Sequence, residues 1–175
     1  MRFDVMPVAT EKQIEEIEAI AVSAFQECHK GIYSHEQISY MSEQFHTKEA
    51  MKRLMKERQI YYMLLADHEL VGYLSFEHQN HHLRLNNLYV KTADRRRGIA
   101  RKAIEQMDKA LSGEEFHHVR KLTINIPRQN TSAAVILQHL GFRITKSIDT
   151  QVGGYVLNDY VMERKINRNS GDYHG

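Results

Sequence analysis

The spacing of hydrophobic residues changes its period several times along this chain, and the order of these changes restricts the fold more than any other feature. Residues 2–7 alternate apolar and polar positions, as a strand does. Apolar residues then recur every three or four positions in three stretches that begin after Thr10, Ser34 and Thr47, which predicts three helices. Short apolar runs follow, interrupted by two more stretches of helical spacing. This order predicts a mixed sheet with helices on its faces.

The later part of the chain predicts six further strands and two helices. The strands are expected at 60–66, 70–76, 83–90, 122–126, 142–148 and 155–165, and the helices at 99–111 and 132–140. Asp67, His68 and Glu69 fit the turn of a hairpin between the first two of these strands. Gly141 fits the C-terminal cap of the last helix. The strand at 83–90 is expected to alternate, with Leu83, Leu85 and Tyr89 on one face and Leu88 and Val90 on the other, so that its end is buried on both faces.

Length and composition fit one folded domain. The chain has 175 residues, of which 42% are hydrophobic and 26% are charged. These fractions are close to the averages of globular proteins and unlike those of disordered chains. We therefore expect a single domain over 1–175, with its core at about 1–166 and a short polar tail at 167–175.

Several features indicate a cytoplasmic location. Cys28 is the one cysteine of the chain, so no internal disulfide can form, which suits a reducing compartment. No apolar run approaches the roughly 18 residues of a membrane span, and the first residues lack the apolar segment of a signal peptide. We expect no membrane partner, and we interpret Cys28 as a small buried side chain rather than a nucleophile.

The segment between Leu85 and Met107 carries the clearest chemical signal, because a strand leads there through a basic loop into a helix. Backbone N–H groups in the first turn of a helix lack partners within the helix and lie at the positive end of its dipole, so they bind anions. Gly98, at the expected helix start, would let a phosphate approach the backbone closely. Four arginines add positive charge to the same turn: Arg95, Arg96, Arg97 and Arg101.

Other phosphate-binding classes fit this loop less well. It lacks the GxxxxGK[ST] pattern of a P-loop and has only one of the three glycines of a dinucleotide fingerprint. Arginine clusters also bind nucleic acid, but no aromatic platform or second basic patch accompanies this one, so nucleic acid is the less favoured partner. A solvated helix start without a ligand is the remaining alternative.

Three motifs, in the expected order, resemble the GNAT superfamily of acetyl-CoA-dependent N-acetyltransferases. RRRGIA at 95–100 is similar to its [Q/R]-x-x-G-x-[G/A] pyrophosphate loop. NTSAAVILQHLGF at 130–142 is similar to its N-x-x-A segment, and DHELVGY at 67–73 to the hairpin between its second and third strands. Residues 39–73 resemble, less sharply, the bacterial polyamine acetyltransferase branch. The resemblance implies an α/β (α+β) fold with a mixed, mostly antiparallel sheet of about seven strands and helices on both faces.

The resemblance also implies roles for residues around the basic loop. Backbone amides at 95–101 would hold the pyrophosphate of acetyl-CoA, and the strand at 88–90 would bind its pantetheine arm. A backbone N–H of Leu88 or Tyr89 would stabilise the oxyanion. The implied cofactor-binding residues are Leu88, Tyr89, Val90, Arg95, Arg96, Arg97, Gly98, Ile99, Ala100, Arg101, Asn130 and Ala133. The amine would attack the thioester directly, with no metal involved.

Two positions depart from the superfamily's pattern. Many relatives have a tyrosine that protonates the departing thiolate where this chain has Leu137. A thiol pKa of roughly 8.5 makes thiolate a tolerable leaving group near neutral pH, so the acid is either unnecessary or supplied elsewhere. Tyr155 and Tyr160, on the last strand, are the candidates.

The general base is the second departure, since many relatives carry a glutamate where this chain has Asn86. An amide orients water but takes no proton. Glu77 is the candidate base, and His81 or His82 are alternatives because the pKa of histidine suits this task. The polar run at 77–82 also fits a plain hairpin loop, and its histidines lack the ligand spacing of a metal site.

Together these features predict an N-acetyltransferase that acts on a primary amine. The first 77 residues hold 13 acidic and eight basic residues, whereas the remainder holds nine acidic and 16 basic. The acceptor groove is expected in the helices between Gln26 and Arg58, whose acidic residues favour a cationic, polyamine-like small molecule. These residues are Glu27, Glu36, Glu43 and Glu49. The alternatives are a protein or peptide amine as acceptor, and a catalytically weak acyl-CoA-binding regulatory module. A homodimer is also considered.

Overall fold

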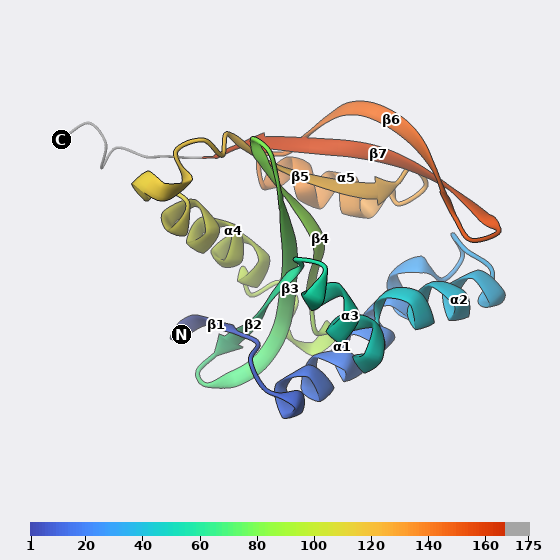
Figure 1. The fold of residues 1–175 in the computed structure, drawn as a ribbon, viewed down its shortest axis with the longest axis horizontal. Helices are drawn as coiled ribbons and strands as arrows, with labels where there is room; N and C mark the ends of the chain where they lie inside the picture. The colour runs from blue at the N-terminus through green and yellow to red at the C-terminus, as the bar shows by residue number, and fades with distance from the viewer. Residues whose placement is uncertain (167–175) are drawn as a thin grey trace.

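Seven strands form one mixed sheet in the order β1-β2-β3-β4-β5-β7-β6, which confirms the fold class expected from the sequence (Figure 1). The computed structural model describes residues 1–166, so the polar tail expected at 167–175 lies outside the described residues. The elements are β1 (Phe3–Pro7), α1 (Glu11–His29), α2 (His35–Phe45), α3 (Lys48–Lys56), β2 (Ile60–Ala66), β3 (Glu69–Gln79), β4 (His82–Val90), α4 (Ile99–Ala110), β5 (Lys121–Pro127), α5 (Thr131–His139), β6 (Arg143–Val152) and β7 (Tyr155–Lys165). Short 3-10 turns lie at Thr92–Asp94 and Glu114–Phe116. All neighbouring strands are antiparallel except β4 and β5.

Side-chain caps begin the helices where the sequence places them. The Thr10 hydroxyl accepts the Gln13 N–H at 3.2 Å while the Gln13 side chain accepts the Thr10 N–H, which completes a capping box. Ser34 and Thr47 cap α2 and α3 in the same way through their hydroxyls. The helix α5 ends before Gly141, whose φ of +94° lies in the left-handed region that favours glycine.

The β2–β3 hairpin is confirmed, and its turn explains two unusual backbone conformations. Asp67 and His68 both have positive φ, +50° and +71°, as the two central residues of a tight type I′ turn require. Further along β3, Gly72 lies opposite Val90 at the close of the ladder with β4. A Cβ at Gly72 would lie 2.2 Å from the Tyr89 carbonyl oxygen, so only glycine allows the two strands to approach this closely.

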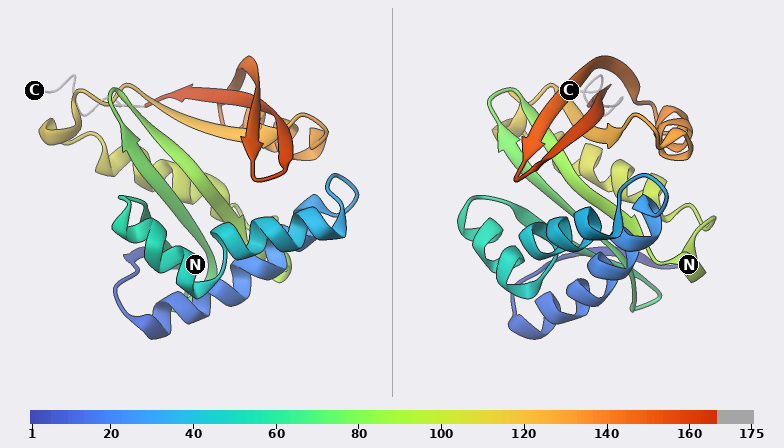
Figure 2. Two further views of the ribbon diagram at one scale, coloured as in Figure 1. Left: turned by 45° about the vertical axis from the view of Figure 1, so that its right-hand side comes forward. Right: turned by 90° about the vertical axis from the view of Figure 1, so that its right-hand side faces the viewer.

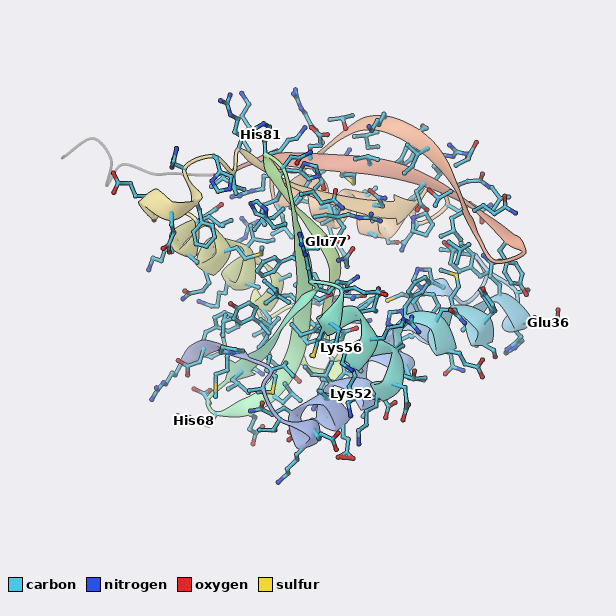
Figure 3. The ribbon with its side chains drawn as sticks, in the orientation of Figure 1. Glu36, Lys52, Lys56, His68, Glu77 and His81 are labelled. Carbon is cyan, nitrogen blue, oxygen red and sulfur yellow. The ribbon has the colours of Figure 1, made fainter. Side chains whose placement is uncertain are left out.

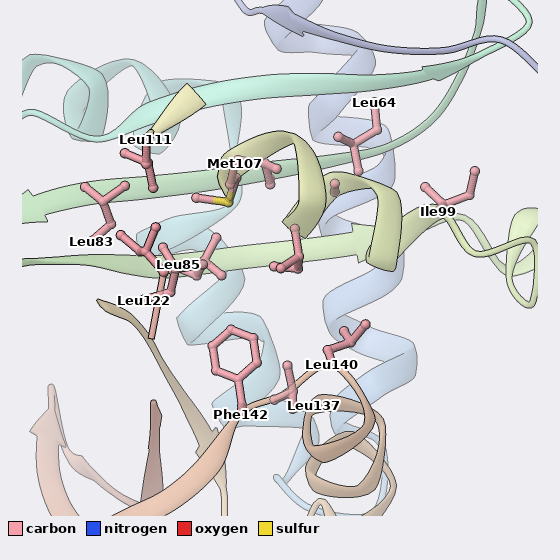
Figure 4. Packing of buried hydrophobic residues seen from close by; sticks show 14 of the residues in the cluster. Leu64, Leu83, Leu85, Ile99, Met107, Leu111, Leu122, Leu137, Leu140 and Phe142 are labelled. Carbon is pink, nitrogen blue, oxygen red and sulfur yellow. The ribbon is translucent and has the colours of Figure 1, made fainter. Parts of the chain in front are cut away.

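The helices cover both faces of the sheet, as expected. Figure 2 shows α1, α2 and α3 together on one side of the central strands and α4 on the other. The α4–α5 core is the cluster of buried residues between α4, α5 and the sheet, and it includes Leu85, Ile104, Leu122 and Leu137 (Figure 4). A second cluster joins α1 and α3 to the opposite face and includes Ile17, Met51 and Tyr73. The sheet therefore separates the molecule into two environments.

A bulge in β4 confirms apolar residues on both faces near the end of this strand but exchanges the faces that the sequence led us to expect. Ser75 pairs with Asn87, yet the next residue of β3, Phe76, pairs with Leu85, so Asn86 is the extra residue. Leu83 and Leu85 point to the α4–α5 core before the bulge, and Leu88 and Val90 pack against the same core after it. Tyr89 therefore faces the α1 side rather than sharing a face with Leu83 and Leu85.

Candidate active site

The two parallel strands at the centre of the sheet pair over a short distance and then separate. The ladder between β4 and β5 runs from His82↔Lys121 to Leu85↔Ile124 and has no further pairs. Figure 1 shows β4 running away from β5 beyond these paired ends. The backbone of β4 from residue 86 to residue 90 thus has β3 on one side and no strand on the other. Such an unpaired edge presents N–H and C=O groups to any ligand that offers complementary amides.

The loop after β4 ends in a helix start that is open to an anion. Gly98 is the N-cap of α4 and has a φ of +75°. The first intrahelical hydrogen bond runs from the Lys102 N–H to the Gly98 carbonyl at 3.0 Å, so the preceding amides have no partner within the helix. A Cβ built at Gly98 would meet nothing within 4 Å. The residues present therefore fit a pyrophosphate, because free amides surround an empty space at the positive end of a helix dipole.

Three of the four arginines hold the loop in place. Arg95 donates to the Val90 carbonyl at 3.1 Å and forms an ion pair with Glu27 of α1 at 3.1 Å. Arg97 pairs with Asp94 at 2.7 Å. Arg101 donates to the carbonyl of His139 at 3.1 Å and so joins α4 to the end of α5.

Arg96 differs from the other three arginines of the loop. It is exposed, has a φ of +66°, and its side chain makes no hydrogen bond to another residue within 1–166. Among the four arginines, it is therefore the side chain most available to a ligand.

Asn130 and Leu137 of the α5 region both have structural roles in the fold. The Asn130 side chain is the N-cap of α5, where its Oδ1 accepts the Ala133 N–H at 3.1 Å. Leu137 is buried in the α4–α5 core beside Leu140 and Phe142 (Figure 4). The position that many relatives give to a proton donor is therefore part of the hydrophobic core in this chain.

Of the candidate bases, Glu77 alone lies near the point where the strands separate. It pairs with Arg84 across the β3–β4 ladder, and its carboxylate is 4.0 Å from the Arg84 guanidinium. Figure 3 shows Glu77 along the middle of the sheet and His81 at the far tip of the β3–β4 hairpin. His82 contacts Gln79 at 3.1 Å and begins the paired part of β4. The two histidines therefore lie at the paired end of β4 and not at its free end.

The two candidate acids lie in different surroundings. Tyr155 packs on Tyr40 of α2, with ring centroids 5.6 Å apart, at the tip of the β6–β7 hairpin. Tyr160 is half-buried, pairs with Ile126 of β5 and packs against the α4–α5 core. Tyr160 is thus the one of the pair that lies on the same face as α4 and α5.

The acidic residues of the first helices do not gather around one groove. Glu27 binds Arg95 and also accepts the Thr92 hydroxyl at 2.9 Å, so it closes the phosphate loop against α1. Glu36 lies at the far end of α2, away from Lys52 and Lys56 of α3 (Figure 3). Glu43 and Glu49 are exposed as well. The pairing of Glu27 with a residue 68 positions away was not visible in the sequence.

Cys28 carries no disulfide and is half-buried, as the sequence suggested. Burial raises the pKa of its thiol above the ordinary value, although the nearby Arg95 acts in the opposite direction. A raised pKa reduces the thiolate fraction near neutral pH, which disfavours a nucleophilic role.

One buried acidic side chain was not singled out from the sequence. Asp159 of β7 is only 7% exposed, and its Oδ1 is buried with no hydrogen-bond partner among the described residues. Burial raises the pKa of its carboxyl, while Arg84 and Arg128 act to lower it. An acidic residue within an otherwise alternating strand was the one available signal, and the sequence did not show that this residue is buried.

Two cavities adjoin the site on the α1–α2 side. One, of about 300 Å³, lies between the α1–α2 loop and the ends of β5 and β7, and its lining includes Tyr33, Gln37, Arg128 and Asn158. The other, of about 280 Å³, lies between α1 and the end of β4, and its lining includes Glu27, Val90 and Arg95. Within residues 1–166, no group of three or more His, Cys, Asp or Glu side chains is placed to hold a metal ion.

The parallel strands separate beside an open helix start, and comparisons with known proteins assign the class of protein. A family model described as an acetyltransferase (GNAT) domain matches residues 30–164. The chain belongs to this family of acetyl-CoA-dependent N-acetyltransferases. None of its described helices is both long and apolar enough to span a bilayer.

Solved structures share the fold. The PaiA N-acetyltransferase of Thermoplasma acidophilum, solved with coenzyme A, is 20% identical with a TM-score of 0.74, over 94% of this chain and 99% of that one. The ribosomal-protein-S18-alanine N-acetyltransferase of Escherichia coli is 13% identical with a TM-score of 0.67, over 97% of both chains. A GNAT acetyltransferase of Elizabethkingia anophelis with bound acetyl-CoA is 14% identical with a TM-score of 0.63, over 93% of this chain and 97% of that one. A search of curated proteins finds no match.

Proposed function

We propose that this protein transfers the acetyl group of acetyl-CoA to a primary amine. The transfer takes place where β4 and β5 separate beyond the Leu85–Ile124 pair, a region that we call the wedge. The observation that carries this proposal is the unpaired edge of β4, which leads directly to the open N-terminus of α4. Acetyl-CoA supplies an activated thioester when it is bound. The chain's own residues then bind it, orient it and exclude water.

The residues of this region have separable tasks in the proposal. The amides at the start of α4, with Gly98 and the Arg96 side chain, hold the pyrophosphate. The free edge of β4 binds the pantetheine amides, and a backbone N–H of Leu88 or Tyr89 faces the carbonyl oxygen on which negative charge develops. Asn130 and Ala133, which are joined by the cap at the start of α5, are proposed to contact the cofactor as well. Tyr160 is the proposed proton donor to the thiolate.

For the acceptor, we propose a cationic small molecule of the polyamine type. The exposed Glu36 and Glu43 of α2, a helix without lysine or arginine, support this choice because they attract cations. A protein or peptide amine is the alternative acceptor. We also propose a cytoplasmic location, which the lone cysteine Cys28 supports because it can form no internal disulfide. A further proposal is that the whole chain forms one domain.

The test is release of free thiol from acetyl-CoA with a panel of amines: spermidine, a monoamine of similar length and a peptide with a free N-terminus. We expect kcat/KM to be highest for spermidine at low ionic strength and its advantage to shrink at 0.1 M salt and above, where exposed charges are screened beyond about 10 Å. Equal kcat/KM for spermidine and the monoamine at low salt would reject the polyamine class. The highest rate with the peptide would favour the alternative acceptor.

A second function, an acyl-CoA-binding module with little catalysis, is favoured by one observation. Leu137 is part of the hydrophobic core, so the proton donor of many relatives has no counterpart at that position. Calorimetry that shows acetyl-CoA binding, without thiol release for any amine, would support this second function.

A homodimer is a separate proposal, supported by large apolar residues that are exposed on α5, β6 and β7: Val135, Ile136, Ile144 and Val156. Sedimentation of the purified chain tests it, and a mass of one chain at all concentrations would reject it.

A further inference from the structure

Asp159 is placed at the wedge by the pairing of β7 with β5. Its partner in the ladder is Pro127, three residues beyond the last pair that β5 makes with β4. The neighbouring strand lies roughly 5 Å away, so Asp159 lies one strand from the part of β5 that borders the wedge. Side chains alternate along a strand, and Leu157, two residues before Asp159, packs with Phe25, Ile38 and Met41 on the α1–α2 face. Asp159 therefore faces the α1–α2 side.

The carboxylate of Asp159 lacks the partners that a buried charge normally has. Its Oδ1 has no hydrogen-bond partner within residues 1–166. The two arginines within electrostatic reach have other acidic neighbours, since Arg84 lies 4.0 Å from Glu77 and Arg128 donates to Asp149 at 3.1 Å. A buried carboxylate without a direct partner is costly to a fold. A cationic ligand bound at this position would supply the missing partner.

A cavity of about 300 Å³ lies next to Asp159, although Asp159 itself is not part of its lining. Pro127 and Asn158, the ladder partner and the chain neighbour of Asp159, belong to its lining, as do Tyr33 and Arg128. Asp159 and Tyr33 are also close electrostatically, because the Asp159 charge contributes to a raised pKa of the Tyr33 hydroxyl, for which burial is the larger cause. The cavity is therefore lined by the Tyr33 hydroxyl, by side-chain amides and by the Arg128 guanidinium, and it lies beside the strand position of Asp159.

We propose that Asp159 binds the ammonium group of the acceptor amine and takes its proton, a role that rests on the proposed function. One N–H bond of the ammonium breaks and an O–H bond forms on the carboxylate, which frees the nitrogen lone pair. That lone pair forms the C–N bond with the acetyl carbon, and the C–S bond breaks with its electron pair leaving on sulfur. A second nitrogen proton ends on the thiolate, and Asp159 returns its proton to solvent. The net change is ammonium plus acetyl-CoA to amide, CoA thiol and one proton.

The groups that face Asp159 determine the pH dependence of this step. Arg84 from β4 and Arg128 after β5 favour the ionised carboxylate, whereas burial opposes ionisation. Tyr33 from the α1–α2 loop is the third titratable neighbour. Only ionised Asp159 binds the ammonium, so kcat/KM falls as the pH falls through the raised pKa of this carboxyl. Arg128→Gln removes one of the two favourable charges and shifts that acid limb to higher pH.

The experiment compares Asp159→Asn with a matched control, Glu163→Gln. Glu163 lies on the same face of β7, four residues from Asp159. It forms an ion pair of 3.0 Å with Lys121, where β4 and β5 are still paired. Affinity for acetyl-CoA is measured by calorimetry, folding by thermal unfolding, and kcat/KM by thiol release over a range of pH. We expect Asp159→Asn to bind acetyl-CoA normally and to unfold at or above the wild-type temperature. We expect it to lose about 100-fold or more in kcat/KM, together with the acid limb, as for removal of a general base.

A second acceptor separates proton transfer from a merely structural role. Aminoacetonitrile is a weak base and is uncharged at the pH of the assay, so it needs no proton removed before attack. Its kcat/KM is expected to fall much less in Asp159→Asn than that of a strongly basic amine, while Glu163→Gln changes neither by more than about threefold.

Equal losses for both amines, or a retained acid limb in Asp159→Asn, would overturn the role of Asp159 alone. The absence of thiol release by the wild-type protein with every amine would overturn the proposed function and, with it, this role.

Discussion

At the scale of single residues, the phosphate loop depends on backbone conformation more than on charge. Arg95, Arg97 and Arg101 are each engaged within the protein, so their guanidinium groups shape the loop. In the proposed function, the left-handed φ of Gly98 and the free amides that follow it are the features that would meet the pyrophosphate. The sequence predicted the helix start at Gly98 correctly, because the glycine requirement of such a turn is local. It did not indicate which arginine is available, since that depends on partners far away in the chain.

The first prediction concerns Gly98 and uses a pair of substitutions of equal size. Asparagine and aspartate both tolerate the left-handed region better than other side chains, and the space above Gly98 is open. Gly98→Asn should bind CoA within about tenfold of the wild type. Gly98→Asp places a negative charge beside the pyrophosphate and should weaken binding by a further 100-fold or more, as about 3 kcal/mol of lost and repulsive electrostatics would.

Calorimetry with CoA measures both constants, and thermal unfolding checks the fold of each variant. Equal affinities for Gly98→Asn and Gly98→Asp would contradict the placement of the pyrophosphate at this helix start.

The second prediction concerns the proton donor. Tyr160 lies on the face shared with α4 and α5, whereas Tyr155 packs on Tyr40 at the hairpin tip. We expect Tyr160→Phe to lower kcat by about tenfold, less than the usual 100-fold or more for a general acid, because a thiol is already a fair leaving group. Single-turnover measurements with saturating acetyl-CoA separate this effect from product release. A loss confined to Tyr155→Phe would instead assign the role to Tyr155.

At the scale of elements, local signals predicted the helices and the hairpin but not the shape of β4. Capping residues and the Asp67-His68 turn act over three or four residues, so their sequence is sufficient evidence. The bulge at Asn86 is a property of the ladder between β3 and β4, and no residue of β4 announces it. The bulge nevertheless decides which side chains of β4 face α1 and which face the α4–α5 core.

The third prediction concerns Arg164 of β7, whose hydrogen bonds connect this strand to α4 and to the end of α5. Arg164 makes two hydrogen bonds of 2.8 Å to the Asp108 carboxylate and donates from Nε to the Leu140 carbonyl at 2.9 Å. Both side chains are largely buried, so Asp108→Ala leaves an uncompensated charge and should lower the free energy of unfolding by about 3–5 kcal/mol. Urea unfolding measures this difference.

The double variant Asp108→Leu with Arg164→Met removes both charges and should recover part of the loss. A loss below about 1 kcal/mol for Asp108→Ala would show that the ion pair contributes little to holding these elements together.

At the scale of the whole molecule, a buried histidine makes folding sensitive to pH. His46, at the end of α2, packs against Phe25 of α1 at 4.6 Å and Tyr89 of β4 at 6.5 Å between ring centroids. Burial, with a smaller contribution from His29, lowers its pKa to about 4 from the ordinary 6.5. The histidine thus stays neutral in the folded protein while it takes a proton in the unfolded chain below pH 6.5.

The fourth prediction follows from this difference. The unfolded state binds more protons between about pH 6.5 and 4, so the stability that neutral His46 confers is complete above 6.5 and is lost as the pH falls toward 4. The loss corresponds to about 3 kcal/mol. We expect His46→Phe to unfold with a smaller difference between pH 7 and pH 4 than the wild type. The control is the exposed His35→Gln on the same helix, and identical pH dependence in all three proteins would contradict the assignment.

The order of the elements, their caps and turns, the helix start after β4 and the class of enzyme could all be predicted from the sequence. Each of these rests on contacts between residues a few positions apart, or on a motif that reports such contacts. Four features became visible only in the folded chain. The strands β4 and β5 separate after four pairs, and Glu27 holds the loop through Arg95. Leu137 is part of the core, and Asp159 is buried with no partner for its Oδ1 among the described residues. These features join residues far apart in the chain, and burial of a charge depends on everything packed around it. An acidic residue in a strand looks the same in the sequence whether it faces water or a substrate.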